Sequence, residues 1–186
     1  STAALEGALG AALTAMVCGL TTVGKSREKY AEYQEFVLAS QKKALDLKAR
    51  FMDVMDRDTE AFNVVSAAFG MPKATDEEKA ARKAAMQEAL KGCTKTPFEM
   101  MELACQALEL TRSVVGKLNA SAASDLGCAA LSLKAAIQGA WLNVLINIGG
   151  IQDQAFADEY RQKGQALLDK ALPLADAIYQ EVLESL

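Results

Sequence analysis

The 186-residue sequence contains no histidine. Histidine is the commonest general base and the commonest side-chain metal ligand, so its absence excludes Ser-His-Asp and Cys-His catalysis and most zinc chemistry. We therefore expect no metal site.

Aromatic residues make up only 6% of the chain, there are three prolines, and β-branched residues are sparse. This composition favours helices over sheets, because β-branched and aromatic residues are the ones enriched in strands.

Low-complexity and strongly polar segments are also missing. Hydrophobic residues make up 51% of the chain and charged residues 24%, which excludes disordered and collagen-like proteins. A chain of 186 residues corresponds to one domain and buries a hydrophobic core without disulfides or metal ions. We expect residues 1–186 to form a single all-α domain.

The four cysteines form no Cys-x-x-Cys pair. Cys18, Cys105 and Cys128 lie among apolar residues with helical spacing, and Cys93 lies in an expected loop. Buried or incidental thiols are the simplest interpretation. Reduced thiols and the lack of a cleavable signal segment predict a cytoplasmic protein.

The chain has no excess of basic residues. Its formal net charge is −4 and its pI is near 5.0, so it has no general positive field for a phosphate backbone, and we expect no nucleic-acid partner.

Residues 1–20 are apolar enough to raise the question of a membrane-spanning helix, but Glu6, Thr14 and many alanines dilute this stretch and it lacks a charged leading segment. We expect a close-packed helix of a soluble bundle and no membrane contact.

Helical periodicity with readable start and stop signals runs along the whole chain. Two capping boxes, Thr75–Glu78 and Thr96–Glu99, predict helix starts, and Pro72 prevents a preceding helix from continuing. The expected helices are Thr2–Thr22, Arg27–Phe69, Thr75–Leu90, Thr96–Lys117, Ser124–Ile148 and Gln154 to the end of the chain, the last bent at Pro173. The sequence therefore predicts an all-α bundle of about six helices.

The segment Ser124–Ile148 carries only two charged residues, Asp125 and Lys134. A helix that is apolar on every side is buried nearly all round, and one bundle layer of a small domain gives little cover for it. A second copy of the chain supplies such cover, so we expect a homodimer; surface helices wrapped around the segment are the alternative.

One carboxylate lies on the apolar face of the second expected helix. Asp53, Asp56 and Glu60 follow one another at helical steps on a polar stripe, whereas Asp58 shares its stripe with apolar residues, among them Phe51, Val54, Met55, Phe62 and Val65. Burial raises the pKa of a carboxyl group toward neutrality, which is what a general acid or base needs. The alternative is a structural aspartate that caps a neighbouring helix or pairs with a lysine.

A second polar set surrounds the fifth expected helix. It consists of Asn119, Ser121, Ser124, Asp125, Asn143 and Asn147. Asn143 and Asn147 share one helix face, and amides pair with both donors and acceptors of a polar heterocycle. The alternative is that the serines cap the helix, Asp125 complements its dipole and the asparagines bridge helices.

The stretch Gly24–Tyr30 gathers Lys25, Arg27 and Lys29 beside an aromatic ring. These residues suit the anionic tail of a small substrate, and a solvated helix start is the alternative. No G-x-x-x-x-G-K-[ST] or G-x-G-x-x-G pattern is present, so the stretch is not a phosphate-binding loop.

Several segments, taken together, resemble one family. These segments are Ser1–Leu13, Gly24–Lys25 with Tyr30, Asp56–Phe62, Met71–Lys73, Asn119–Ala130 and Gly139–Ile148. They extend over essentially the whole chain in order and resemble the cyclodeaminase/cyclohydrolase family of folate enzymes. That family includes the C-terminal domain of formiminotransferase-cyclodeaminase and stand-alone methenyltetrahydrofolate cyclohydrolases. The family also has a Pro-Gly-Gly-Gly turn just before the residue that matches Ser1, and this sequence does not contain it.

The resemblance implies an all-α homodimer that acts on the one-carbon bridge of a tetrahydrofolate substrate without a prosthetic group. It also implies that the acid/base aspartate of the family corresponds to Asp58, the residue that helical spacing separates from Asp56. The candidate substrate-binding residues are Ser1, Lys25, Arg27, Tyr30, Asn119, Ser124, Asp125, Asn143 and Asn147. Of these, Lys25 and Arg27 are candidates for the glutamate tail.

Three functions follow as expectations. We favour a methenyltetrahydrofolate cyclohydrolase, which converts 5,10-methenyltetrahydrofolate and water to 10-formyltetrahydrofolate, because the sequence carries no formiminotransferase domain. The alternative within the family is a 5-formiminotetrahydrofolate cyclodeaminase that releases ammonia, and the helical pattern does not separate the two. The alternative of another class is a non-catalytic helical interaction protein, for which Asp58 is dispensable.

Overall fold

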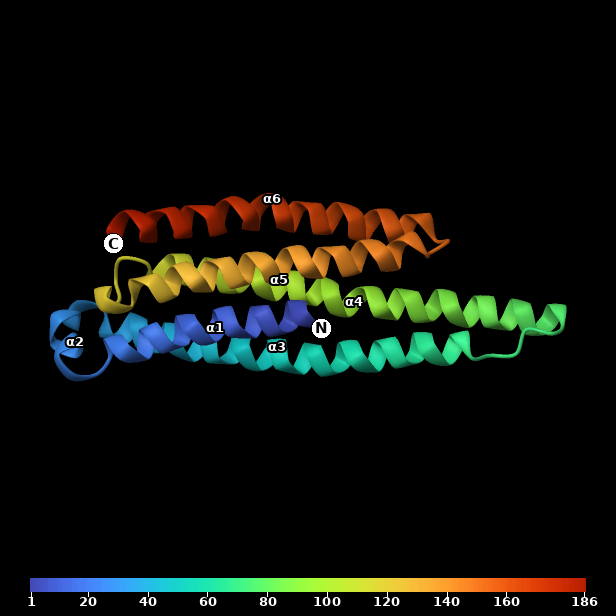
Figure 1. Cartoon of the computed structure of the whole chain (residues 1–186), viewed down its shortest axis with the longest axis horizontal. Coiled ribbons are helices and arrows are strands. Elements are labelled where there is room, and N and C mark those ends of the chain that lie inside the picture. Colours follow the sequence, from blue (N-terminus) through green and yellow to red (C-terminus); the bar gives the residue numbers. More distant parts are fainter.

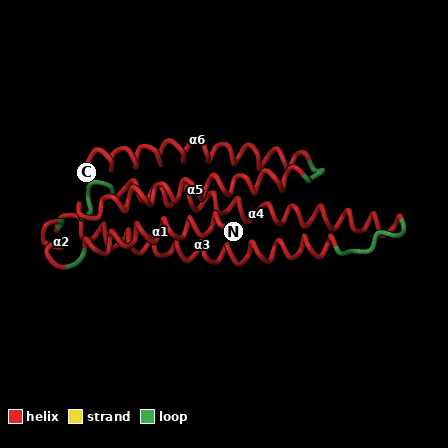
Figure 2. The backbone as a smooth tube through the Cα atoms, in the orientation of Figure 1, coloured by secondary structure: helices red, strands yellow, loops and turns green.

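The chain forms six α-helices and two single 3₁₀ turns, with no strand (Figure 1 and Figure 2). A computed structural model describes all residues, 1–186. The helices are α1 Thr2–Thr21, α2 Gly24–Lys29, α3 Gln34–Phe69, α4 Asp76–Val114, α5 Ala123–Gly149 and α6 Gln154–Ser185, and the 3₁₀ turns are η1 Ala31–Tyr33 and η2 Ala120–Ala122. The all-α class predicted from the sequence is confirmed.

Five long helices lie side by side, and the short α2 lies at one end of the bundle (Figure 1). The helix α1 packs against α3 and α5, and α4 packs against α3, α5 and α6. At the other end, α3 and α4 extend beyond the turn between α5 and α6. We call this projecting part, which consists of the end of α3, the loop 70–75 and the start of α4, the tip. Val65, Ala89 and Cys93 form a small apolar cluster between α3 and α4 that is separate from the main core.

Small residues let α1 approach its neighbours closely, as their helical spacing predicts. A Cβ atom at Gly7 would lie 2.2 Å from the ring of Phe51 on α3, and one at Gly10 would lie 2.5 Å from Leu133 on α5. Phe51 and Leu133 are both fully buried. The main core therefore forms where the alanine- and glycine-rich faces of α1 meet these two larger side chains.

The expected start of the helix Arg27–Phe69 is wrong. The helix is interrupted at Tyr30–Tyr33, and α3 begins at Gln34. Three hydrogen bonds stabilise the break. The side-chain amide of Gln34 donates to the carbonyl oxygens of Thr21 (3.1 Å) and Tyr30 (3.2 Å). The Tyr30 hydroxyl accepts a hydrogen bond from the Ala120 N–H at 3.1 Å. Two of these hydrogen bonds, Gln34 to Thr21 and Ala120 to Tyr30, join residues 13 and 90 positions apart, which local spacing does not reveal.

The expected boundaries at Leu90 and Thr96 are also wrong, because α4 runs unbroken through both and Cys93 lies inside it. Pro97 has no N–H, so the Cys93 carbonyl lacks its normal partner four residues later. The side-chain amide of Asn147 on α5 donates to that carbonyl at 2.8 Å. A neighbouring helix thus supplies the hydrogen bond that the proline removes, and α4 continues.

The predicted capping box Thr96–Glu99 forms contacts between helices instead. The Thr96 hydroxyl donates to an Asp58 carboxylate oxygen at 2.8 Å. Glu99 accepts two hydrogen bonds from the Arg57 guanidinium, at 2.8 and 2.9 Å. By contrast, the box at Thr75 is confirmed, since Thr75 accepts from the Glu78 N–H and Glu78 accepts from the Thr75 N–H.

The helix α5 is not buried all round in one chain, which corrects the expectation for Ser124–Ile148. Leu131, Leu142 and Ile146 are 47%, 68% and 76% exposed.

By length and composition alone, α1 and residues 120–149 resemble membrane-spanning helices, a property they share with core helices of soluble bundles. Both helices pack within the bundle here.

Replacing Asn147 by alanine tests the contact that covers the Cys93 carbonyl. The change leaves a buried acceptor unpaired, and we expect the free energy of unfolding to fall by about 1–3 kcal/mol. Asn143→Ala is the matched control on the same helix, because its amide donates to the Gly139 carbonyl at 2.9 Å within α5 itself. Urea unfolding of both variants measures the difference.

Pro97→Ala makes the test specific, because alanine restores the N–H that the Cys93 carbonyl lacks. In that background we expect Asn147→Ala to cost less than about 0.5 kcal/mol. Equal losses with Pro97 and with Ala at position 97 would contradict the interpretation.

Candidate functional site

Asp58 lies on α3 facing α4 and is partly buried rather than fully enclosed. One of its carboxylate oxygens accepts the 2.8 Å hydrogen bond from Thr96, which is itself only 7% exposed. Asp58 forms no ion pair, so neither of the structural roles expected as alternatives, a helix cap or a lysine partner, is observed. The pKa of the Cys93 thiol is raised, first by burial and then by the negative charge of the nearby Asp58 carboxylate.

The residue before Asp58 holds this part of α3 against α4. Arg57 binds Glu99 through two hydrogen bonds and also donates to Asp53 at 2.7 Å. The hydrogen bonds to Glu99, and then those to Asp53, raise the pKa of Arg57 above its ordinary value, so the guanidinium stays charged. Arg57 is thus paired with Asp53 and Glu99, and Asp58 has no cationic partner.

Asp58 opens into a cavity of about 420 Å³ between α1, α3 and α5. The lining residues are Ser1, Thr2, Ala3, Glu6, Asp58, Ala135, Gly139 and Asn143. Three residues predicted as site residues, Ser1, Asp58 and Asn143, therefore meet here although they are distant in sequence. Small side chains from α1 and α5 leave the space that these polar groups border.

Glu6 is a second carboxylate at this cavity, and the sequence reasoning did not assign it a role. A signal was present, because Glu6 is the single charged residue between Thr2 and Thr21. It resembles the signal that singled out Asp58, a carboxylate on an otherwise apolar helix face. Glu6 is partly buried and forms no ion pair.

Asn147 does not line the cavity. Its side-chain amide binds the Cys93 carbonyl, so it bridges α5 and α4, which was the structural alternative expected for the two asparagines. Asn143 lies one turn earlier and borders the cavity. The pair therefore divides into one residue at the site and one that holds the neighbouring helix.

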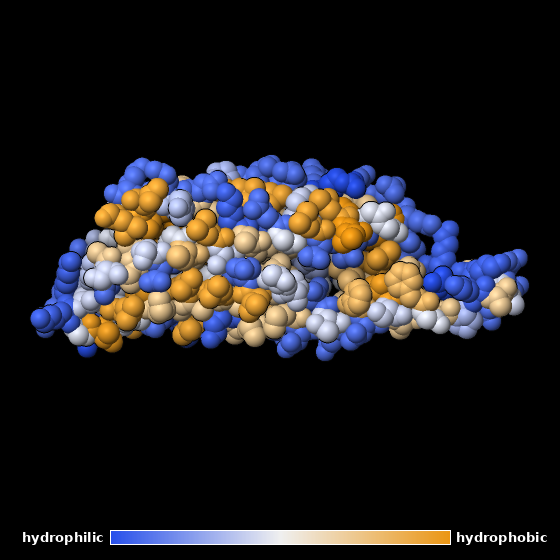
Figure 3. All heavy atoms as spheres, in the orientation of Figure 1, coloured by the Kyte–Doolittle hydropathy of each residue, from blue (hydrophilic) through white to orange (hydrophobic).

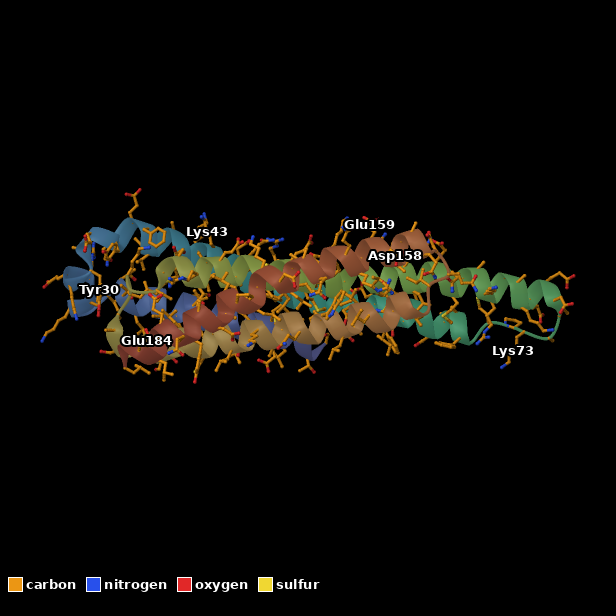
Figure 4. The ribbon with its side chains drawn as sticks, turned by 90° about the horizontal axis from the view of Figure 1, so that it is seen from above. Tyr30, Lys43, Lys73, Asp158, Glu159 and Glu184 are labelled. Atoms are coloured by element: carbon orange, nitrogen blue, oxygen red, sulfur yellow. The ribbon has the colours of Figure 1, made fainter.

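The remaining predicted residues lie at the other end of the bundle, where α2 and the start of α5 come together (Figure 4). They are Lys25, Arg27, Tyr30, Asn119, Ser124 and Asp125. Tyr30 and Asn119 line a separate cavity of about 190 Å³. The 20 residues of α1 span about 30 Å between this end and Ser1. Within one chain, the structure does not bring this group to Asp58.

The chemistry of the cavity is that of two carboxylates, an amide and two hydroxyls among small apolar residues. No group of three or more acidic or thiol side chains is arranged to hold a metal ion. A partly desolvated carboxylate with a single hydrogen-bond donor can exchange a proton with a bound molecule and stabilise a cation beside it.

Comparison with known proteins places this geometry in context. A family model described as Formiminotransferase-cyclodeaminase matches residues 1–166. The chain is 41% identical to a methenyltetrahydrofolate cyclohydrolase from Methylorubrum extorquens over 97% of this chain and 85% of that protein. It is 33% identical to a formimidoyltransferase-cyclodeaminase from Sus scrofa over 92% of this chain, which corresponds to 31% of that longer protein.

A solved structure has the same fold. The crystal structure of a formiminotetrahydrofolate cyclodeaminase from Thermotoga maritima superposes with a TM-score of 0.77, covering 99% of this chain and 84% of that one, at 24% identity. The fold, the family match over most of the chain and the 41% identical relative agree. The chain belongs to the formiminotransferase-cyclodeaminase family.

Proposed function

We propose that this protein is a methenyltetrahydrofolate cyclohydrolase, which converts 5,10-methenyltetrahydrofolate and water to 10-formyltetrahydrofolate. The observation that carries the proposal is the 41% identity to a cyclohydrolase over 97% of the chain. The cavity at Asp58 supports it, because the carboxylate has one hydrogen-bond donor and no cationic partner. A cationic substrate fits such a site.

In the first step, a water molecule adds to the methenyl carbon. That carbon belongs to a cationic amidinium, so it is electrophilic without a metal ion. Asp58 accepts a proton from the attacking water as the new carbon–oxygen bond forms, and the product is a neutral tetrahedral adduct. Before this step, the ionised carboxylate stabilises the positive charge of the substrate, and the low-polarity walls strengthen that interaction.

In the second step, the carbon–N5 bond breaks. Asp58 returns its proton to N5, the adduct hydroxyl loses its own proton to solvent, and the carbonyl of the N10-formyl group forms. The sum consumes one water and releases one proton. One carboxylate serves as base and then as acid because the two transfers occur in sequence. The Thr96 hydroxyl holds Asp58 in one orientation for both transfers.

The other polar groups of the cavity suit the reduced pterin. Asn143 offers a side-chain amide with both donor and acceptor capacity, and Ser1 offers a hydroxyl. Glu6 adds a second negative charge that favours the cationic substrate over the neutral product. We assign these three residues to binding and Asp58 to catalysis.

A cyclodeaminase is the second candidate, favoured by the family match and by the fold of the Thermotoga maritima protein. In that reaction N10 attacks a formimino carbon and Asp58 protonates the departing ammonia. Both reactions use the same ring geometry and the same carboxylate, so the substrates themselves distinguish them.

The proposal includes a homodimer. Leu5, Leu9, Met16 and Leu20 form one exposed stripe along α1, each between 42% and 57% exposed. The exposed leucines and isoleucine of α5 add to it, since α1 packs along α5. Apolar side chains reach the surface in several places on this side of the molecule (Figure 3). A two-fold pairing of this face would bury it and cover the adjacent cavity.

Asp58→Asn tests the catalytic role. Asparagine keeps the shape and still accepts the hydrogen bond from Thr96, so we expect folding to be retained and turnover of 5,10-methenyltetrahydrofolate to fall on the order of 100-fold or more. The loss of the substrate's near-ultraviolet absorbance measures turnover. The matched control is Asp56→Asn, an exposed carboxylate two residues away, for which we expect wild-type rates.

Retained activity in Asp58→Asn would reject the mechanism. If wild-type protein leaves 5,10-methenyltetrahydrofolate unchanged but raises the same absorbance from the formimino substrate, the cyclodeaminase is established instead. No reaction with either substrate would favour the non-catalytic interaction protein, for which Asp58→Leu is expected to stabilise the fold.

Light scattering tests the dimer. We expect a mass twice the 19.8 kDa of one chain at micromolar concentration. Leu9→Glu combined with Met16→Glu places two charges in the proposed interface and should yield the monomer. Leu183→Glu, an equally exposed leucine on α6, is the control and should leave the dimer intact. A monomeric wild-type protein would overturn the pairing.

A further inference from the structure

Glu6 is the second carboxylate at the cavity that Asp58 borders, and the two residues come from different helices. Glu6 lies in the second turn of α1, whereas Asp58 lies on α3. No lysine or arginine lines this cavity, and neither carboxylate forms an ion pair. The cavity thus presents two separate carboxylates, and each is available to a bound molecule.

Close contacts on both sides fix the backbone that carries Glu6. A Cβ atom at the next residue, Gly7, would lie 2.2 Å from the Phe51 ring on α3. A Cβ atom at Gly139 on α5 would lie 3.5 Å from the Cβ of Ala3, which is one turn before Glu6. The first turns of α1 are therefore packed directly against both α3 and α5, and Glu6 has a defined position at the cavity.

The two carboxylates differ in what holds them. Thr96 donates to one Asp58 oxygen at 2.8 Å, so Asp58 is held in one orientation. The Glu6 carboxylate has no hydrogen-bond donor from the protein, and its side chain is half-buried. Both of its oxygens are therefore available to the bound molecule and to water. Such a carboxylate can take a proton from the cavity and release it to solvent.

Hydrolysis of the methenyl bridge moves two protons at different times. Asp58 takes the first proton from the attacking water and returns it to N5. The second proton belongs to the adduct hydroxyl, and it leaves as the carbon–N5 bond breaks and the formyl carbonyl forms. At the start of this step Asp58 still carries the first proton, so it is not able to accept another. The second proton needs a second acceptor.

Glu6 is the one other side chain lining the cavity that can be this acceptor. The remaining polar groups there are the hydroxyls of Ser1 and Thr2 and the amide of Asn143. None of these is a base near neutral pH, whereas a carboxylate is. All other lining residues are alanine or glycine.

We propose that Glu6 is a second catalytic residue, the base that takes the proton of the adduct hydroxyl. This inference rests on the proposed function. As the carbon–N5 bond breaks, its electron pair goes to N5, which receives the Asp58 proton. The O–H bond of the adduct breaks toward Glu6, and its electron pair forms the second bond of the carbonyl. Protonated Glu6 then releases the proton to water, so the sum remains one water consumed and one proton released.

The cyclodeaminase reaction has no such second proton. N10 gives its proton to Asp58 as it attacks the formimino carbon, and the departing amine receives that proton from Asp58. One carboxylate is sufficient for this sequence, because no hydroxyl adduct forms. A second carboxylate at the cavity is therefore a requirement of the hydrolysis and not of the deamination.

Glu6→Gln tests the assignment, because it keeps the length of the side chain and removes the base. We expect kcat for 5,10-methenyltetrahydrofolate to fall on the order of 100-fold, and KM, which reports the loss of the charge, to rise less than about tenfold. Glu60→Gln is the matched control. It removes the same charge from an exposed position two residues after Asp58 and should keep the wild-type kcat. Far-ultraviolet circular dichroism checks that both variants fold.

Rescue by a small carboxylate separates proton transfer from a charge effect. Glu6→Ala leaves space at the cavity for formate or acetate, and we expect either ion to raise kcat of this variant about tenfold or more, in a saturable manner. Sodium chloride at the same ionic strength should have no effect. Glu6→Gln should not respond to formate, because its side chain fills the space.

Three results would contradict the assignment. An unchanged kcat in Glu6→Gln, together with the expected loss in Asp58→Asn, would remove Glu6 from catalysis and leave the proposed function in place. A lower kcat that neither formate nor acetate restores in Glu6→Ala would limit Glu6 to a binding charge. If the wild type leaves 5,10-methenyltetrahydrofolate unchanged, the proposed function fails, and the role of Glu6 fails with it.

Discussion

The missing N–H of Pro97 is the constraint on which the centre of this molecule depends. Helix α4 carries that proline in its interior and remains continuous because Asn147 on α5 binds the carbonyl that the proline leaves unpaired. The same turn of α4 presents Thr96 to Asp58 and Glu99 to Arg57. This turn of α4 thus contacts both α3 and α5, and its Thr96 hydroxyl holds the carboxylate we assign to catalysis.

The sequence predicted the fold class because its signals there are local. Composition, helical spacing and the glycine and alanine pattern of residues 2–21 depend on neighbours along the chain. The box at Thr75 was recognised for the same reason, and it forms as predicted. The box at Thr96 has the same residue pattern but its side chains bind α3. A capping signature and a set of contacts between helices look alike in sequence, and only packing separates them.

In the site, too, local signals identify single residues, whereas packing decides which residues lie together. Asp58 is predictable because a carboxylate on an apolar stripe is unusual, and Glu6 on α1 carries the same signal. Separating Lys25, Tyr30 and Asn119 from Asp58 requires the distance along the bundle, which local sequence patterns do not give. The sequence shows which residues are polar, but the 20-residue length of α1 decides which of them share a cavity. In the proposed homodimer, residues of a second copy also border the covered face.

The projection of α3 and α4 beyond the rest of the bundle has a consequence for how the protein opens. Backbone amides on the tip are held by two helices and a small separate cluster around Val65, whereas those of the main core are enclosed by neighbours on several sides. Local unfolding needs least free energy where few apolar contacts are broken. We therefore expect hydrogen exchange to be fastest at the tip and slower from Gln87 onward, where the Gln87 side chain binds Gly150 and Gln152 at the turn between α5 and α6. On this basis the tip opens at a lower free energy than the main core.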